Sequence, residues 1–224
     1  YVPDGDYVVI KFARWAFEKF KGVEDKLGTQ MRAVGEVMSI GKTYKEAFQK
    51  AIRSLETGRF GLGHAKNFDS LTKDQLLKLL ITASSERHFI MYEALRKGAT
   101  VDEIHELTKV KHYFIQQMKE LVEEEEALMQ FKGNLPSDEA LISAKKNGFS
   151  DKYLSQILEV PEEDIRNKRI VLGVEEAWEG VHVSGTENNA YYYSTYNAED
   201  KNVVTDNKKI MILGGGPNRI GQGI

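Results

Sequence analysis

The 224-residue sequence contains no cysteine and only four prolines. The lack of cysteine excludes a disulfide framework, a thiolate nucleophile, a cysteine-ligated zinc ion and an iron–sulfur cluster. No apolar run approaches the roughly 20 residues that a membrane-spanning helix needs, so we expect no membrane partner. The formal net charge is only -3, which gives no overall attraction to nucleic acid. This composition is typical of a cytoplasmic protein.

Helix-start signals recur through the middle of the chain. Thr43, Thr72 and Thr100 are each followed three residues later by Glu or Gln, the pattern of a capping box. Ser137 and Ser150 are further N-cap residues, and a glycine, such as Gly58 after the first helix, ends most segments. At least six helices are expected between residues 58 and 173, so the predicted fold class is mainly α. The predicted apolar stripes are Ala47, Phe48, Ala51, Ile52 and Leu55; Leu76, Leu77, Leu79 and Leu80; Val101, Ile104 and Leu107; and Phe114, Ile115, Met118, Leu121, Val122 and Leu128.

Strand-like segments stand near both ends of the sequence. Residues 6–12 and 209–213 are expected to form strands, and residues 29–41 a loop followed by a buried strand. A lone strand with half a helix cannot bury its apolar faces, so we interpret both ends as truncated α/β pieces of a larger protein. The predicted divisions are 1–57 and 209–224 for the α/β pieces, 58–196 for a compact multi-helix domain and 197–208 for a polar linker.

A glycine-rich loop follows the last predicted strand. Gly214 and Gly216 begin a dinucleotide-binding fingerprint, but Arg219 stands where its third glycine belongs. The spacing from Gly216 to Gly221 fits a P-loop, but residues 222–223 replace its lysine and hydroxyl. A tight strand-to-helix turn is the favoured interpretation, and an anion-binding helix N-terminus is the alternative. The candidate residues of this strand-to-helix loop are Gly214, Gly215, Gly216, Arg219 and Gly221.

Three other patterns have a functional and a structural interpretation. Residues 149–166 resemble a helix-turn-helix, but three carboxylates in the first turn of its second helix would repel DNA. Residues 123–126 are four glutamates that fan around a helix, so they predict a solvated face rather than a metal site. His105 and His112 would share a face only on one continuous helix, and no third zinc ligand lies nearby. No catalytic, cofactor-binding or metal-ligating residue is therefore predicted.

Several strings, in order along the chain, resemble one family. Residues 6–11 (DYVVIK), 17–20 (FEKF) and 30–41 (QMRAVGEVMSIG) are similar to the end of the first ATP-grasp half of carbamoyl-phosphate synthase large chains. Residues 148–151 (GFSD) resemble a turn in the central oligomerisation domain of that family. Residues 193–196 (YSTY) and 209–224 (KIMILGGGPNRIGQGI) resemble the junction into the second half. Residues 180–190 depart from the family, which has a cysteine-containing acidic string there.

The resemblance implies a parent enzyme that is an ATP-dependent C–N ligase with magnesium or manganese as its metal. One half would phosphorylate bicarbonate and receive ammonia, and the other would phosphorylate carbamate, for arginine and pyrimidine synthesis. A glutaminase subunit or domain would be its partner. The family's ATP and metal ligands lie outside the matched region, so we expect a non-catalytic scaffold that self-associates through its helices. A helix-turn-helix nucleic-acid-binding regulator is the alternative.

Overall fold

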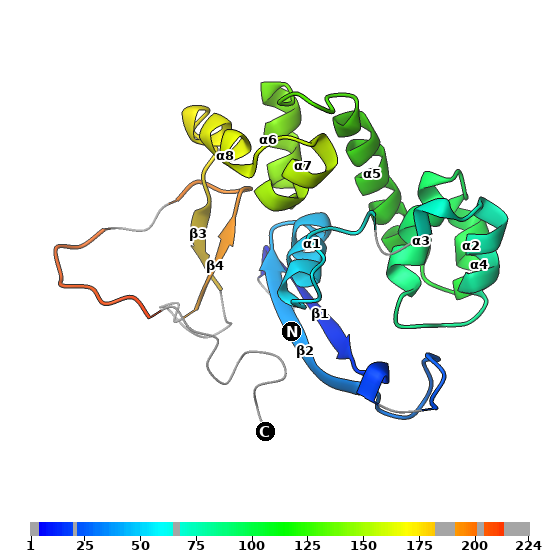
Figure 1. Cartoon of the computed structure of the whole chain (residues 1–224). Coiled ribbons are helices and arrows are strands. Elements are labelled where there is room, and N and C mark those ends of the chain that lie inside the picture. Colours follow the sequence, from blue (N-terminus) through cyan, green and yellow to red (C-terminus); the bar gives the residue numbers. More distant parts are fainter. Residues whose placement is uncertain (1–4, 20–21, 65–67, 182–190, 201–203, 213–224) are drawn as a thin grey trace.

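The computed structural model describes residues 5–19, 22–64, 68–181, 191–200 and 204–212. An antiparallel hairpin comes first, and helix α1 packs on it (Figure 1). A second antiparallel pair, formed by β3 and β4, lies beside β2. The bounds of these elements are β1 (Val8–Trp15), the 3-10 helix η1 (Phe17–Lys19), β2 (Ala33–Gly41), α1 (Tyr44–Ser54), β3 (Ala177–Gly180) and β4 (Tyr192–Thr195).

Seven further α-helices follow α1 in the described part of the chain, which confirms the mainly α prediction. The longest, α5, contacts α3 and α4 on one side and α7 on the other (Figure 1). Among the described residues, no helix combines the length and the apolar character needed to cross a bilayer. The bounds are the 3-10 helix η2 (Phe68–Ser70), α2 (Lys73–Leu80), α3 (Arg87–Arg96), α4 (Val101–Thr108), α5 (His112–Met129), α6 (Asp138–Lys146), α7 (Asp151–Leu158) and α8 (Glu162–Val171).

The predicted caps start most of these helices. Thr72 and Thr100 form reciprocal capping boxes at α2 and α4, and Ser137 and Ser150 cap α6 and α7. Each such cap stabilises its helix by about 1 kcal/mol. Because these bonds join residues three apart, the sequence alone was sufficient to predict them.

The capping box predicted at Thr43 is only half correct. Thr43 Oγ1 accepts a hydrogen bond from the Glu46 backbone N–H at 3.2 Å. The Glu46 carboxylate does not accept the second hydrogen bond of a capping box, from the Thr43 backbone N–H. It accepts one from the Lys42 N–H instead, at 2.8 Å. The end of the same helix also differs, because α1 stops at Ser54, before the predicted Gly58. The Glu46 carboxylate also accepts hydrogen bonds from residues 195–197, which are described below.

Two strand predictions need correction. Strand β2 is half-buried rather than buried, because Val37 faces the core while Met38 is 63% exposed. Residues 209–212 form no strand, and the side chains of residues 210–212 are exposed. A strand requires ladder hydrogen bonds to a neighbour, and no described segment pairs with these residues. By contrast, the aromatic segment shortly before them does pair with a neighbour and forms β4.

One apolar core runs through the hairpin and the helices. It extends from Phe12 of β1, through Phe48 and Ile52 of α1, to Ile165 of α8. The Phe12 and Phe48 rings lie 6.1 Å apart between centroids. Helix α1 therefore shares its core with helices that follow residue 58, and the predicted division there remains a prediction.

Candidate functional site

The glycine-rich loop taken from the sequence as a candidate remains a prediction. Gly214, Gly215, Gly216, Arg219 and Gly221 lie outside the described residues. The predicted helix-turn-helix corresponds to α7 and α8, which pack together across a turn at Glu159 in the left-handed conformation. The first turn of α8 carries Glu162, Glu163 and Asp164. This acidic helix start would face the DNA phosphates unfavourably, so the structure lends no support to nucleic-acid binding.

His105 and His112 lie together although they belong to different helices. Their ring centroids are 3.9 Å apart. The expectation that they needed one continuous helix is wrong, because Lys109 turns the chain in the left-handed region (φ 57°). His105 Nδ1 is 2.7 Å from the Val110 carbonyl, and His112 Nε2 is 3.0 Å from an Asp102 oxygen. Within the described ranges, no group of three acidic or histidine side chains could hold a metal ion.

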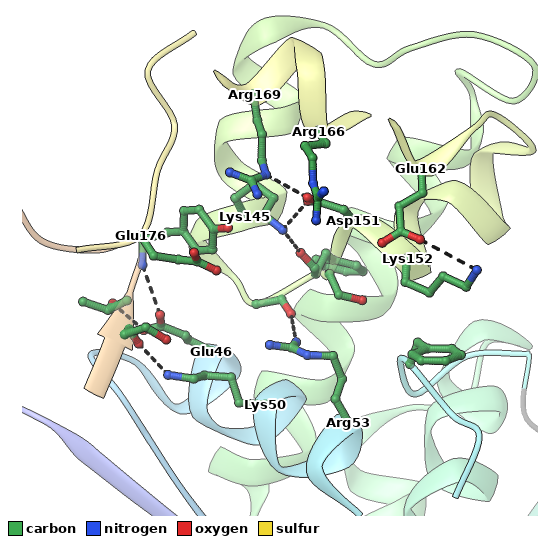
Figure 2. A pocket seen from close by; sticks show the side chains of 17 residues that line it. Glu46, Lys50, Arg53, Lys145, Asp151, Lys152, Glu162, Arg166, Arg169 and Glu176 are labelled. Carbon is green, nitrogen blue, oxygen red and sulfur yellow. Dashed lines mark hydrogen bonds and ion pairs between the residues drawn. The ribbon is translucent and has the colours of Figure 1, made fainter. Parts of the chain in front are cut away.

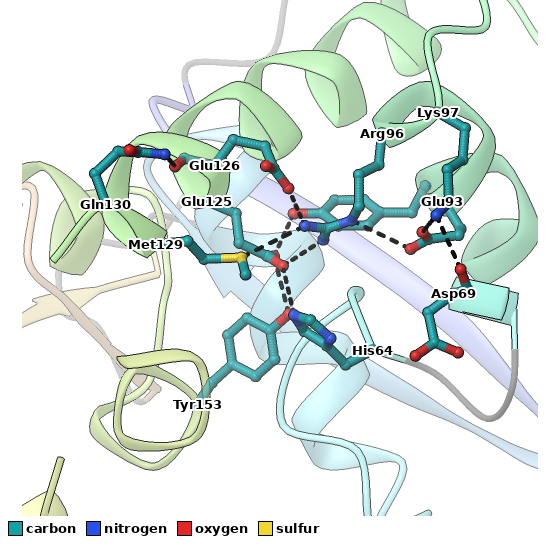
Figure 3. A network of polar contacts seen from close by, with 11 residues as sticks. His64, Asp69, Glu93, Arg96, Lys97, Glu125, Glu126, Met129, Gln130 and Tyr153 are labelled. Atoms are coloured by element: carbon teal, nitrogen blue, oxygen red, sulfur yellow. Dashed lines mark hydrogen bonds and ion pairs between the residues drawn. The ribbon is translucent and has the colours of Figure 1, made fainter. Parts of the chain in front are cut away.

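The four-glutamate run is not uniformly solvated, because the Glu125 side chain is 0% exposed. It projects from α5 into a cluster drawn from several elements (Figure 3). The hydroxyls of Tyr92 and Tyr153 donate to its carboxylate at 2.6 and 2.9 Å, and Arg96 forms an ion pair with it. The solvated-face prediction is therefore wrong for Glu125, whose position falls within the apolar stripe of the helix.

The electrostatics of this Glu125 cluster favour a charged pair inside the core. Burial raises the pKa of the Tyr92 and Tyr153 hydroxyls well above their usual value, and the nearby carboxylate raises it further. Burial alone would lower the pKa of Arg96, but its contacts with Glu125 reverse the direction, so the guanidinium stays charged. Neutral phenols and a charged arginine together stabilise the carboxylate and tie α3, α5 and α7 to one another.

Two glycines let the loop before η2 approach this cluster. A Cβ atom at Gly61 would lie 2.6 Å from the Tyr153 ring, and one at Gly63 would collide with the Glu125 carboxylate. Both positions therefore need glycine. The sequence contains no local signal for this requirement, because it arises from the packing of α5 and α7 against the loop.

A polar pocket of about 380 Å³ lies between α1, α7, α8 and β4 (Figure 2). Glu46 stands at one side and is 2% exposed. Its carboxylate accepts hydrogen bonds from Thr195 Oγ1 at 3.0 Å, the Tyr196 N–H at 3.3 Å and Asn197 Nδ2 at 3.2 Å. A carboxylate at the start of α1 thus holds the segment after β4 against the helices.

The other side of the polar pocket is built around Asp151, at the start of α7. Lys145 donates to its carboxylate at 2.6 Å and Arg169 at 2.7 Å. Burial would raise the pKa of Asp151, but these two cations hold it below its usual value. Asp151 is therefore ionised and joins α6, α7 and α8. The carboxylates of Glu46 and Asp151 are thus both engaged in contacts that join separate elements.

Two groups of exposed apolar side chains lie on elements that contact each other. The first, here called the tip surface, comprises Leu79 (43% exposed) and Ile81 (67%) at the end of α2 and Leu107 (37%) on α4, a helix that α2 contacts. The second, the sheet surface, lies over the two strand pairs. It comprises Val9, Val34, Met38, Trp178, Tyr191 and Tyr192.

Comparison with known proteins identifies relatives along almost the whole chain. Residues 36–173 match the model of the carbamoyl-phosphate synthetase large chain, oligomerisation domain. The carbamoyl phosphate synthase large chain of Archaeoglobus fulgidus is 44% identical over 99% of this chain and 21% of its own length. That of Synechocystis is also 44% identical, over 99% of this chain and 21% of its own length. The arginine-specific, chloroplastic large chain of Arabidopsis thaliana is 45% identical, over 99% and 19%.

The chain spans about a fifth of the length of these relatives. The family match covers β2 from Glu36, all eight helices and Gly173, so it includes both the Glu125 cluster and most of the polar pocket. The resemblance inferred from the sequence is confirmed by both comparisons. The chain belongs to the carbamoyl-phosphate synthetase large chain family, of which it carries the oligomerisation domain.

Proposed function

We propose that this chain is the self-association and scaffold segment of an ATP-dependent carbamoyl-phosphate synthase. The observation that carries the proposal is the match of residues 36–173 to an oligomerisation domain, in a fold whose buried charges hold helices together. In the parent enzyme, two ATP-grasp halves would use ATP with magnesium or manganese. They would make carbamoyl phosphate from bicarbonate and ammonia, the latter delivered by a glutaminase partner. Arginine and pyrimidine synthesis in the cytoplasm would be the context.

The two exposed apolar surfaces fit two different roles. The sheet surface lies on strands whose sequences resemble parts of the catalytic halves, so contact with those halves would cover it. The tip surface belongs to α2 and α4, inside the region matched by the oligomerisation domain. Apolar side chains at such a position favour association, and a specific interface buries on the order of 1,600 Å². The tip surface is therefore the proposed self-association surface.

Sedimentation analysis of matched variants tests this assignment. We expect the chain to associate in the micromolar range and Ile81→Glu to shift it to monomer, because a carboxylate would be desolvated in the interface. Met38→Glu on the sheet surface is the control and should leave the association unchanged. A wild-type chain that stays monomeric throughout, or a Met38→Glu variant that dissociates while Ile81→Glu does not, would contradict the proposal.

A second measurement addresses the catalytic expectation. We expect no hydrolysis of ATP by this chain alone, because its buried acidic groups are already engaged with cations or hydroxyl donors. Magnesium-dependent release of phosphate above the background rate would refute this expectation. It would leave the self-association result untouched, so the two parts of the proposal are judged separately.

A further inference from the structure

The polar pocket between α1, α7, α8 and β4 carries more positive than negative side chains. Six basic and four acidic residues line it, a difference of two. An excess of cations around a cleft favours an anionic occupant. The basic residues are Lys50, Arg53, Lys145, Lys152, Arg166 and Arg169, and the acidic ones are Glu46, Asp151, Glu162 and Glu176.

The four carboxylates are already engaged. Asp151 forms ion pairs with both Lys145 and Arg169, and Glu46 accepts hydrogen bonds from several donors. The Glu162 carboxylate lies 3.7 Å from Lys152 Nζ. Glu176 interacts with the Tyr196 hydroxyl, whose pKa is raised by burial and by this carboxylate. The carboxylates of the pocket are thus engaged in contacts within the protein.

Among the described residues, two of the cations donate hydrogen bonds to neutral acceptors only. Arg53 donates to the Gly148 carbonyl at 2.6 Å, and Lys50 donates to the carbonyls of Ile40 at 2.6 Å and Ser194 at 2.5 Å. Burial lowers the pKa of both side chains despite the surrounding carboxylates. Their charges are therefore incompletely compensated in the pocket, and an anion placed there would stabilise them.

The geometry points to a phosphate-binding site in this pocket, for inorganic phosphate or the phosphoryl group of a small phosphate monoester. Arg53 rises from α1 and Arg166 descends from α8, so the two guanidinium groups approach the pocket from opposite sides (Figure 2). Guanidinium groups bind phosphate oxygens with paired hydrogen bonds. The volume of about 380 Å³ lies at the lower end of the range for small-ligand sites, which suits such a group.

A bound phosphate group would join elements far apart in the sequence. It would link α1 to α8 beside the Thr195 and Tyr196 backbone, which lines the same pocket. Because the ligand would bind only the folded chain, it should raise the unfolding temperature as its concentration increases. None of the tip-surface residues lines the polar pocket, so this inference does not depend on the proposed self-association.

Calorimetric titration of the chain with inorganic phosphate, at constant ionic strength set with chloride, tests the inference. A second titration uses phenyl phosphate, a phosphate monoester. The probe that binds more tightly shows whether the pocket prefers free phosphate or a monoester. We expect saturable binding of at least one probe, and a matching rise in unfolding temperature. No saturable binding of either probe up to about 10 mM would overturn the inference.

Surface variants locate the binding. Arg166→Gln should weaken the affinity about tenfold, the usual loss for one charged hydrogen-bond partner, and Lys152→Gln should weaken it less. Both side chains are solvent-accessible, so the variants should fold, which circular dichroism verifies. Lys109→Gln on the α4–α5 turn is the control and should bind as the wild type does. Equal weakening in Lys109→Gln, or unchanged affinity in Arg166→Gln, would overturn the assignment to this pocket.

Discussion

Two buried glutamates hold different parts of this molecule together, and they are compensated differently. Glu125 on α5 has a cation, Arg96, and two tyrosine hydroxyls within the helical region (Figure 3). Glu46 on α1 receives direct hydrogen bonds from neutral groups, and those from Thr195 and Tyr196 come from about 150 residues further along the chain. Removing a buried carboxylate is costly because the buried groups that it compensates lose their partner. The comparison therefore predicts that Glu125 matters for global stability and Glu46 for attachment of the C-terminal segment.

Removal of the Glu125 carboxylate should have the largest effect. Glu125→Ala leaves two buried tyrosine hydroxyls without their acceptor, so we expect a loss of about 3–4 kcal/mol in unfolding free energy. Arg96 keeps its ion pairs with Glu93 and Glu126, so its charge remains compensated. Urea denaturation measures it. Glu123→Ala, at an exposed position on the same helix, is the control and should change stability by less than about 0.5 kcal/mol. Similar losses in both variants would remove the distinction between the buried and exposed members of the run.

Removal of the Glu46 carboxylate should act more locally. Glu46→Ala deprives Thr195, the Tyr196 N–H and Asn197 of an acceptor, and we expect a loss of about 2 kcal/mol. Amide hydrogen exchange should show reduced protection at Tyr196, while the amides of α5 keep theirs. The comparison fails if protection falls equally in both places, because Glu46 would then contribute to the whole core rather than to one attachment.

The same two residues explain what the sequence could and could not predict. Glu125 was predicted to be solvated, although it falls on the apolar stripe of Leu121, Val122 and Leu128, and that spacing was the signal for its burial. Its partner Arg96 could not be identified, because that contact depends on how α3 packs on α5. The capping boxes at Thr72 and Thr100 were predicted because each is closed within four residues. The polar pocket was not predicted, because its walls come from α1, α6 to α8 and β4.

Single hydroxyl donors sharpen the comparison. Tyr92→Phe and Thr195→Val each remove one donor to a buried glutamate while nearly preserving shape. Because each carboxylate keeps other donors, we expect losses of about 1 kcal/mol in both variants, well below those of the two Glu→Ala variants. Thermal unfolding of the four proteins measures the order. Should Tyr92→Phe cost as much as Glu125→Ala, the tyrosine rather than the Arg96 ion pair would dominate the cluster.

The ion pair between Lys45 of α1 and Glu120 of α5 gives the smallest expected effect and a baseline for both buried glutamates. Its charged atoms lie 2.6 Å apart, but the side chains are 20% and 35% exposed, so solvent screens the attraction. A double-mutant cycle with Lys45→Met and Glu120→Gln should give a coupling energy of about 0.2–1 kcal/mol at neutral pH.

The pH dependence of that coupling follows from the direction of one pKa shift. The hydrogen bond from Lys45 lowers the pKa of Glu120 in the folded chain, so the unfolded state binds its proton more readily. The pair therefore stabilises the fold above the ordinary pKa of glutamate, 4.5, and the contribution disappears as the pH falls through the lowered value. Repeating the cycle near pH 7 and near pH 3 should show the coupling shrink at the lower pH. A coupling energy that persists in acid would mean that packing rather than charge joins α1 to α5 at this point. The difference in solvent exposure would then no longer explain why this pair contributes less to stability than Glu125 does.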